Sequence, residues 1–342
     1  MKKLGVGVIG VGEMGRRHAE NMRRQVPEAR LIAIADVSAQ RVKQVADELE
    51  IEHAYTSMEE MLQRKDIDAV VISSPDKFHA AGIKAAAAAG KDILCEKPLA
   101  LTLEDAHAAL QNVSRAKVRL QIGFMRRYDP AYAAAMNKIA AGEIGTPVVF
   151  KSIGRDKDEP PMAAYTSGVN GMLFYSNTIH DFDLARWLMQ DEVSEVHSYA
   201  TTTIRPEVAK YGDIVAGVVN MKFAKGAIGS IDSNVQALYG YDVRTEVVGS
   251  KGSMFIGSLQ GAPATFLTSA GSSEVLADHF LSRFADAYLT EARDFVHTML
   301  AGKAPRVTGE DGLRALAIAV AAENSHLRSQ PCKVSHESAA SA

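Results

Sequence analysis

A glycine-rich segment near the N-terminus constrains the fold more than any other feature of this chain. Gly10-Val11-Gly12-Glu13-Met14-Gly15 follows an apolar β-branched run and precedes an amphipathic stretch. In such a segment the first glycine makes a tight turn, the second lets a ligand approach the backbone, and the third lets helix and strand pack closely. The spacing therefore predicts a strand, a turn and a helix whose N-terminus can hold a phosphate group.

Strands and helices are predicted to alternate along residues 1–123, which we predict to be the first domain. Short β-branched runs alternate with amphipathic, alanine-rich segments, a pattern typical of a doubly wound parallel sheet in an α/β fold. The predicted strands cover residues 4–9, 29–35, 53–55, 69–73, 92–95 and 118–123. The predicted helices cover residues 16–25, 39–49, 58–64 and 78–89, with a further helix beginning at Thr102.

The pattern changes after residue 123, and longer strands follow one another directly. This predicts an α+β domain over residues 124–308 with a large, open, mainly antiparallel sheet. A final helix within 309–330 has the apolar spacing of a packed helix, and we expect it to cover the first domain. Strands are expected at 148–153, 192–203, 214–223, 227–234 and 242–248, and helices at 131–141, 179–189, 283–300 and 311–327.

Composition excludes several classes of protein. The 38 Lys and Arg residues against 41 Asp and Glu give a net charge of −3, which provides no general attraction to nucleic acid or to an anionic membrane. No apolar run is long enough to span a bilayer. Two isolated cysteines, Cys95 and Cys332, argue against a disulfide framework and a zinc site. We expect a soluble cytoplasmic protein without a metal.

An acidic residue at the end of the second predicted strand strengthens the dinucleotide interpretation. Asp36 lies 21 residues after Gly15, where a carboxylate accepts hydrogen bonds from the adenosine ribose and repels a 2′-phosphate. The cofactor is therefore predicted to be NAD, although Arg41 could allow some use of NADP. The alternative is that the glycines only form a turn and that Asp36 only caps the next helix.

Chemically active residues follow later strands and open a later helix. Lys97, in a Glu-Lys-Pro turn, would lie beside the nicotinamide, where a cation stabilises an alcohol that loses hydride; a surface ion pair with Glu96 is the alternative. His180 is the candidate base for the hydroxyl proton, and Ser176 shares its helix face. Asp181 and Asp183 are expected to cap the helix or to bind backbone and arginine groups.

Several motifs spread over essentially the whole chain resemble one family. They resemble those of the glucose-fructose oxidoreductase and inositol dehydrogenase family, and within it the myo-inositol 2-dehydrogenases most. The motifs are Gly10-x-Gly12-x-x-Gly15-x-x-His18, Glu96-Lys97-Pro98, the segment 123–130, Ile179-His180-Asp181-Phe182-Asp183 and Tyr239-Gly240-Tyr241-Asp242.

The resemblance implies a Rossmann domain, a C-terminal domain with an open sheet, bound NAD, and a homodimer or homotetramer formed through that sheet. It implies that Lys97 and His180 are catalytic and that Arg127 and Tyr239 contact a sugar or polyol substrate. The residues expected at the cofactor are Gly10, Gly12, Glu13, Met14, Gly15, Asp36, Ser74, His79, Glu96 and Lys97.

One position departs from the family pattern. Inositol dehydrogenases usually carry an aspartate four residues before the catalytic histidine, and this chain has Ser176 there. Loss of that carboxylate leaves donors at Ser176, Asn177 and Thr178, and it suggests an anionic sugar as substrate; a tolerated substitution is the alternative. The cations that could bind such a sugar are Arg126, Arg127, Arg155 and Lys157. Two further functions stay open, namely an NAD-dependent glycoside hydrolase that oxidises its sugar transiently and a dinucleotide-binding regulator without turnover.

Overall fold

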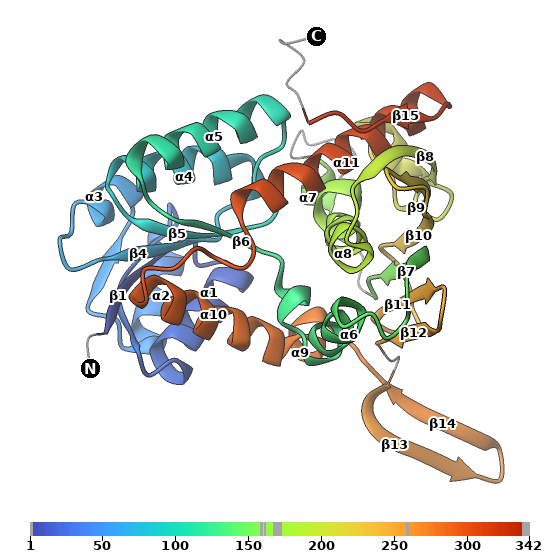
Figure 1. Ribbon diagram of the computed structural model, residues 1–342. Helices are drawn as coiled ribbons and strands as arrows, with labels where there is room; N and C mark the ends of the chain where they lie inside the picture. The colour runs from blue at the N-terminus through green and yellow to red at the C-terminus, as the bar shows by residue number, and fades with distance from the viewer. Residues whose placement is uncertain (1–2, 158–159, 161, 167–172, 258–259, 337–342) are drawn as a thin grey trace. The chain divides into compact units, whose positions relative to one another are not determined.

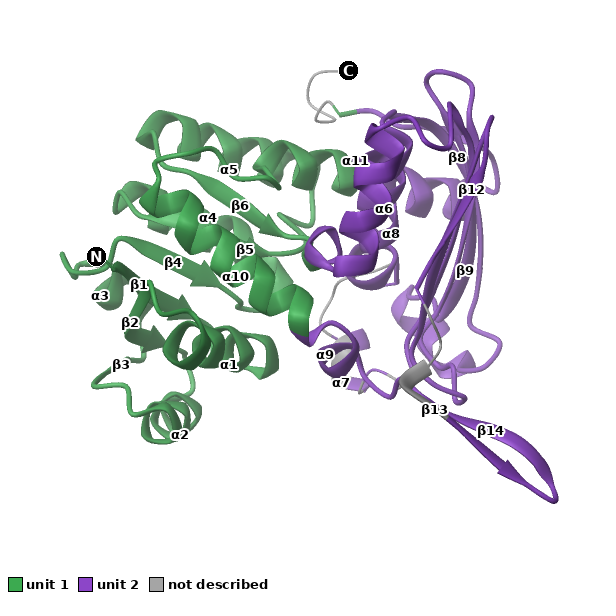
Figure 2. Cartoon of the chain, turned by 60° about the horizontal axis from the view of Figure 1, so that its bottom comes forward, with its two compact units in different colours: residues 1–125, 286–316, 336–342 green, residues 126–285, 317–335 purple. Residues whose placement is uncertain are grey.

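The computed structural model describes residues 3–157, 160, 162–166, 173–257 and 260–336. The chain divides into two compact units (Figure 2). Unit 1 comprises residues 1–125, 286–316 and 336–342, and unit 2 comprises residues 126–285 and 317–335. Within the described ranges, no helix combines the length and the apolar character that crossing a bilayer requires.

Unit 1 contains a six-stranded sheet in which every neighbouring pair is parallel. The order β3-β2-β1-β4-β5-β6 confirms the predicted doubly wound topology. Val71 pairs with Val8 on one side and with Leu94 on the other. The strands are β1 (Leu4–Ile9), β2 (Ala29–Ala35), β3 (His53–Tyr55), β4 (Ala69–Ile72), β5 (Asp92–Glu96) and β6 (Leu120–Gly123).

Helices cover both faces of this sheet, which explains why its strands are continuously apolar. On one face, α1, α2 and α10 share a core cluster that includes Val8, Val45 and Phe295 (Figure 1). On the other face, Gly82 of α4 lies so close to Ile72 that an added Cβ would be 3.2 Å from its Cγ2. The helices are α1 (Glu13–Glu20), η1 (Asn21–Gln25), α2 (Ala39–Leu49), α3 (Met58–Leu62), η2 (Asp76–Phe78), α4 (His79–Ala88), α5 (Leu103–Ala116) and α10 (Ala285–Leu300).

Unit 2 contains a seven-stranded sheet of order β12-β11-β7-β10-β9-β8-β15. Only the β7 and β10 pair is parallel, so the predicted mainly antiparallel sheet is confirmed. Its strands are β7 (Pro147–Arg155), β8 (Val193–Thr201), β9 (Ala216–Phe223), β10 (Ile228–Asn234), β11 (Asp242–Gly249), β12 (Ser253–Ile256) and β15 (Cys332–Lys333), and a separate hairpin is formed by β13 (Gln260–Thr268) and β14 (Gly271–Leu276).

The two faces of this second sheet differ. Alternate residues of β7, such as Phe150 and Ser152, are buried, and Ser152 donates a 2.6 Å hydrogen bond to Asp181 of α8. The opposite face exposes apolar side chains, among them Val218 and Phe255. The helices of unit 2 are η3 (Met125–Tyr128), α6 (Pro130–Ala140), α7 (Met162–Tyr165), η4 (Leu173–Asn177), α8 (Ile179–Met189), η5 (Pro206–Tyr211) and α9 (Phe280–Arg283).

The compact units depart from the predicted domain boundaries. Residues 286–308, which the sequence assigns to the second domain, belong to unit 1 because α10 places Phe295 and Val296 in its core. The predicted helix 283–300 is two helices, since α9 ends at Arg283 and α10 begins at Ala285. The last long helix, α11 (Gly309–Arg328), contributes its first part to unit 1 and the rest to unit 2.

Candidate active site

The glycine segment forms the tight connection from β1 to α1. Gly10 has a φ of +80°, in the left-handed region that favours glycine. A Cβ on Gly15 would lie 1.8 Å from the carbonyl oxygen of Gly10, so only glycine fits where the helix passes the loop. A Cβ on Gly12 would meet nothing within 4 Å, which leaves the backbone open to a ligand. Glu13 and Met14 form the first helical turn.

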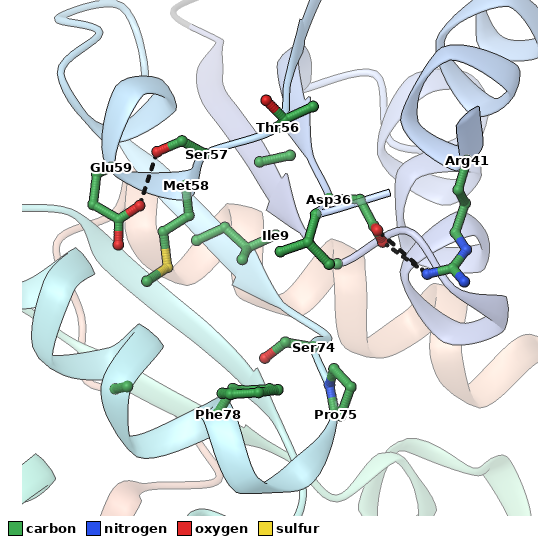
Figure 3. A pocket seen from close by; sticks show the side chains of 14 residues that line it. Ile9, Asp36, Arg41, Thr56, Ser57, Met58, Glu59, Ser74, Pro75 and Phe78 are labelled. Carbon is green, nitrogen blue, oxygen red and sulfur yellow. Dashed lines mark hydrogen bonds and ion pairs between the residues drawn. The ribbon is translucent and has the colours of Figure 1, made fainter. Parts of the chain in front are cut away.

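Asp36 follows β2 and braces this loop. One carboxylate oxygen accepts a 2.9 Å hydrogen bond from the Val11 amide, and the other accepts one of 2.9 Å from the Ser38 amide. The guanidinium of Arg41 lies 3.3 Å from both oxygens (Figure 3). A carboxylate offers about four acceptor positions, so capacity remains for a ribose hydroxyl.

A cavity of about 370 Å³ opens beside Asp36 (Figure 3). Ile9, Met58 and Phe78 give it apolar walls. Gly10, Asp36, Arg41 and Ser74 also line it, so a polar rim surrounds an apolar slot. This combination suits the adenosine half of a dinucleotide, whose base is flat and whose ribose is polar.

His79 links two loops at the carboxyl edge of the unit 1 sheet. Its Nδ1 lies 2.7 Å from the carbonyl oxygen of Pro98, and its Nε2 lies 2.8 Å from that of Ser74. The ring is buried between these two backbone groups. His79, expected at the cofactor, therefore contacts the loop after β4 and the turn that contains Lys97.

Glu96 ends β5, and its side chain enters the interior of unit 1. One carboxylate oxygen lies 2.7 Å from Nε2 of the buried His18 on α1. Burial would raise the pKa of Glu96, but the hydrogen bond from His18 and the electrostatic attraction of His18 and Lys97 outweigh it and lower that pKa. Lys97 follows as a partly exposed residue whose peptide bond to Pro98 is cis.

In unit 2, the predicted second cluster lies where η4 leads into α8. Ser176 and Asn177 belong to η4, and His180 is buried in the first turn of α8. The Asn177 amide donates to the carboxylate of Asp156. Thr178 donates 3.0 Å hydrogen bonds to the Leu173 carbonyl and the Ser233 hydroxyl, which holds the entry to the helix.

Two buried ion pairs anchor α8. Arg126 donates a 2.9 Å hydrogen bond to Asp181, and Arg127 binds Asp183 through two hydrogen bonds of 2.8 and 2.5 Å. The expectation that both aspartates bind arginine groups is confirmed. The guanidinium of Arg127, which the sequence places at the substrate, thus has a carboxylate partner and also lies 5.6 Å from the Trp187 ring.

Arg155 and Tyr239, the other two predicted substrate residues, lie together in a separate network. Arg155 pairs with Asp232 and donates a 3.1 Å hydrogen bond to the hydroxyl of Tyr239, which donates to Asp242 at 2.7 Å. Because Ser152 of β7 points toward α8, the two-residue alternation directs Arg155 to the opposite side of the sheet.

Sequence reasoning missed one residue of the unit 1 site. Glu291 of α10 is fully buried, and it comes close to His18 and Glu96. An acidic residue amid the apolar positions of a packed helix was the available signal. Its partner could not be named, because nothing local indicates where α10 lies.

Two family models match the chain. A model described as an oxidoreductase family with an NAD-binding Rossmann fold matches residues 4–124, and a GFO/IDH/MocA C-terminal domain model matches residues 132–255. The scyllo-inositol 2-dehydrogenase (NAD(+)) of Bacillus subtilis is 38% identical over 327 residues, which cover 96% of this chain and 95% of that protein. The myo-inositol 2-dehydrogenase of Thermotoga maritima is 37% identical over 94% of this chain and 95% of its own length.

Solved structures agree with these relatives. The crystal structure of scyllo-inositol dehydrogenase from Lactobacillus casei with bound NAD(H) and scyllo-inositol has a TM-score of 0.92 to this chain. It is 30% identical, and the match covers 97% of this chain and 99% of the other.

Proposed function

Because the chain belongs to the GFO/IDH/MocA oxidoreductase family with its NAD-binding Rossmann fold, we propose that it oxidises a secondary hydroxyl of a cyclic polyol, using NAD. One observation carries this proposal. Relatives named as inositol dehydrogenases match more than nine-tenths of this chain, and Gly12 and Asp36 have the geometry that a bound dinucleotide requires.

Each predicted residue has a chemical task in this reaction. NAD, when bound, accepts the hydride. The open backbone at Gly12 and the N-terminus of α1 receive the diphosphate, and Asp36 accepts hydrogen bonds from the adenosine ribose. His180 takes the hydroxyl proton, and the ammonium group of Lys97 stabilises the developing alkoxide.

The charges of the arginines favour a neutral substrate over an anionic one. Three of the four cations that an anionic sugar could use, Arg126, Arg127 and Arg155 but not Lys157, form ion pairs with aspartates among the described residues. Recruiting Arg126 or Arg127 would leave a buried carboxylate without its partner, which costs free energy. Ser176 can both donate to and accept from a substrate hydroxyl, so it suits an uncharged polyol.

A substrate panel tests this proposal. Purified protein is incubated with NAD and with myo-inositol, scyllo-inositol, neutral pyranoses, sugar acids or aryl glycosides, while NADH absorbance and aglycone release are followed together. We expect NADH in proportion to oxidised inositol. Faster turnover of sugar acids would show that an anionic substrate is preferred over a neutral one. Aglycone release without net NADH would establish the hydrolase, which the dehydrogenase relatives do not favour.

We also propose that the chain forms a homodimer or homotetramer through the open face of the unit 2 sheet. Val218 and Phe255 expose apolar surface there, with exposed fractions of 43% and 79%. Light scattering after gel filtration tests this, and a monomer would refute it.

We propose a cytoplasmic location as well. Both cysteines are free, which suits a reducing compartment, and burial raises the pKa of the Cys95 thiol and so favours its protonated form.

A further inference from the structure

A cluster of three buried titratable side chains lies inside unit 1. His18 comes from α1, Glu96 from the end of β5 and Glu291 from α10. One nitrogen or oxygen atom of each lies within 4.8 Å of the others. The three elements are the helix that opens on the glycine loop, the strand that leads into Lys97, and a helix from the last fifth of the chain.

Glu291 is the unusual member of this cluster. It is fully buried, and neither carboxyl oxygen has a hydrogen-bond partner among the described residues. A buried polar group without a partner is costly, so its presence calls for an explanation. Burial raises the pKa of Glu291 well above its usual value, and repulsion from Glu96 and Asp294 adds to this effect.

The pKa values of the two carboxyl groups are therefore shifted in opposite directions. The pKa of Glu96 is lowered by His18 and Lys97 despite burial, whereas that of Glu291 is raised, so the single proton is favoured on Glu291. A neutral carboxyl group has one O–H to donate, and the cluster offers the Glu96 carboxylate and the unpartnered Nδ1 of His18 as acceptors. The charged or titratable groups that act on the pair are His18 on α1, His79 on α4, Lys97 after β5 and Asp294 on α10.

We propose that Glu291 is a positioning residue, which together with His18 holds Glu96 and thereby orients Lys97 for hydride transfer. The inference rests on the proposed catalytic role of Lys97. The turn is held from both ends, because His18 binds Glu96 while His79 binds the Pro98 carbonyl. Lys97 lies between these two anchors, so its backbone has little freedom to shift.

A divalent cation is the competing occupant of such a cluster, since imidazole and carboxylates are common metal ligands. The 2.7 Å separation of His18 Nε2 and Glu96 Oε1 is that of a direct hydrogen bond, in which the ring N–H donates to the carboxylate. The positioning role rests on this hydrogen bond, and the metal content of the purified enzyme distinguishes it from a metal site.

The test compares Glu291→Gln with Glu291→Leu in the full-length enzyme with NAD and myo-inositol. Gln keeps the size and can donate as the neutral acid does, whereas Leu removes the donor. We expect Glu291→Leu to lower kcat about 10- to 100-fold, with the KM for myo-inositol and the Kd for NAD nearly unchanged. Glu291→Gln should restore kcat to nearly the wild-type value. Val296→Ala, which cuts the same helix's core packing, is the control and should lower stability without lowering kcat.

Lys97→Met, measured in parallel, distinguishes a failure of the positioning role of Glu291 from a failure of the catalytic role of Lys97. If Lys97→Met is inactive while Glu291→Leu keeps its full kcat, the positioning role is overturned and the proposed function stands. If Lys97→Met remains active, the assignment of Lys97 itself fails. The positioning role is also overturned if Glu291→Gln is as impaired as Glu291→Leu, or if the purified enzyme holds a stoichiometric metal that Glu291→Gln loses.

Discussion

The two units hold their proposed catalytic residues by different electrostatic means. In unit 2, Asp181 and Asp183 flank His180 in the sequence, and each is matched by a buried arginine. In unit 1, two carboxyl groups, Glu96 and Glu291, lie beside a single imidazole, which bonds only Glu96. The charges near His180 therefore balance one to one, whereas Glu291 has no hydrogen-bond partner among the described residues.

This difference has consequences for pH. Burial alone would lower the pKa of Arg126, but the charge of Asp181 outweighs it and the pKa is raised, so Arg126 stays cationic at every accessible pH. The pKa of Glu291 is raised because its surroundings are apolar and negative. The Arg126–Asp181 pair should thus be indifferent to pH near neutrality, whereas the protonation of Glu291 should depend on pH.

Removing either proposed catalytic group should have the largest effect. Lys97→Met and His180→Ala should each lower kcat about 10²- to 10⁴-fold, because His180 takes the hydroxyl proton and Lys97 stabilises the developing alkoxide. Steady-state NADH formation from an oxidised polyol measures the loss. Lys43→Met, at an exposed ion pair with Asp47, is the control and should keep full activity. Wild-type turnover in either catalytic variant would contradict the assignment of that residue.

Breaking one balanced pair in unit 2 should destabilise the fold strongly. Arg127→Met leaves Asp183 buried and uncompensated, which should lower the free energy of unfolding by about 3–5 kcal/mol. Urea denaturation measures the change, and the double variant Arg127→Met/Asp183→Leu should recover much of it. For comparison, Lys43→Met should cost only about 0–1 kcal/mol. If Arg127→Met lowers the free energy of unfolding by no more than Lys43→Met does, the Arg127–Asp183 pair is not essential to stability.

Removing the carboxylate beside the glycine loop should weaken cofactor binding. Asp36→Ala removes an acceptor for the Val11 amide and for the ribose, a charged hydrogen bond of about 1.5–3 kcal/mol, so the Kd for NAD should rise roughly 10- to 150-fold. The preference for NAD over NADP should fall as well, since the repulsion of a 2′-phosphate is lost. Fluorescence titration with both cofactors measures these changes, with the exposed Asp47→Ala as control. If the Kd for NAD is unaltered in Asp36→Ala, the adenosine ribose does not bind at Asp36.

The smallest effect concerns the proton on Glu291. In the unfolded chain this carboxyl group loses its proton as the pH rises past its usual pKa of 4.5, whereas in the folded chain its pKa is raised. The unfolded state is therefore favoured increasingly as the pH rises, and the contribution of Glu291 to stability is lost. Glu291→Gln removes this dependence. The Tm of Glu291→Gln should therefore exceed that of the wild type by a margin that grows between pH 5 and pH 8. Glu104→Gln, at an exposed position, should give no such trend, and a constant margin for Glu291→Gln would argue against a neutral Glu291.

Local structure was largely predictable from the sequence. The predicted segments 29–35, 39–49 and 179–189 coincide with β2, α2 and α8, because hydrophobic periodicity acts over neighbouring residues. The roles of Gly10 and Gly15 were also predictable, since a tight turn and a close helix crossing depend on a few adjacent residues. The domain boundary at 308 was not, because the position of α10 depends on which sheet its apolar face covers.

The sequence by itself determined the glycine loop, and it placed Asp36 and Lys97 after strands and His180 at the start of a helix, because hydrophobic periodicity shows where these elements begin and end. Only the tertiary structure decided that Arg127 neutralises Asp183 and that Glu291 joins His18. The physical reason is that the energy of a charge depends on its distance through space from other charges and on its burial, and neither quantity is a property of sequence separation.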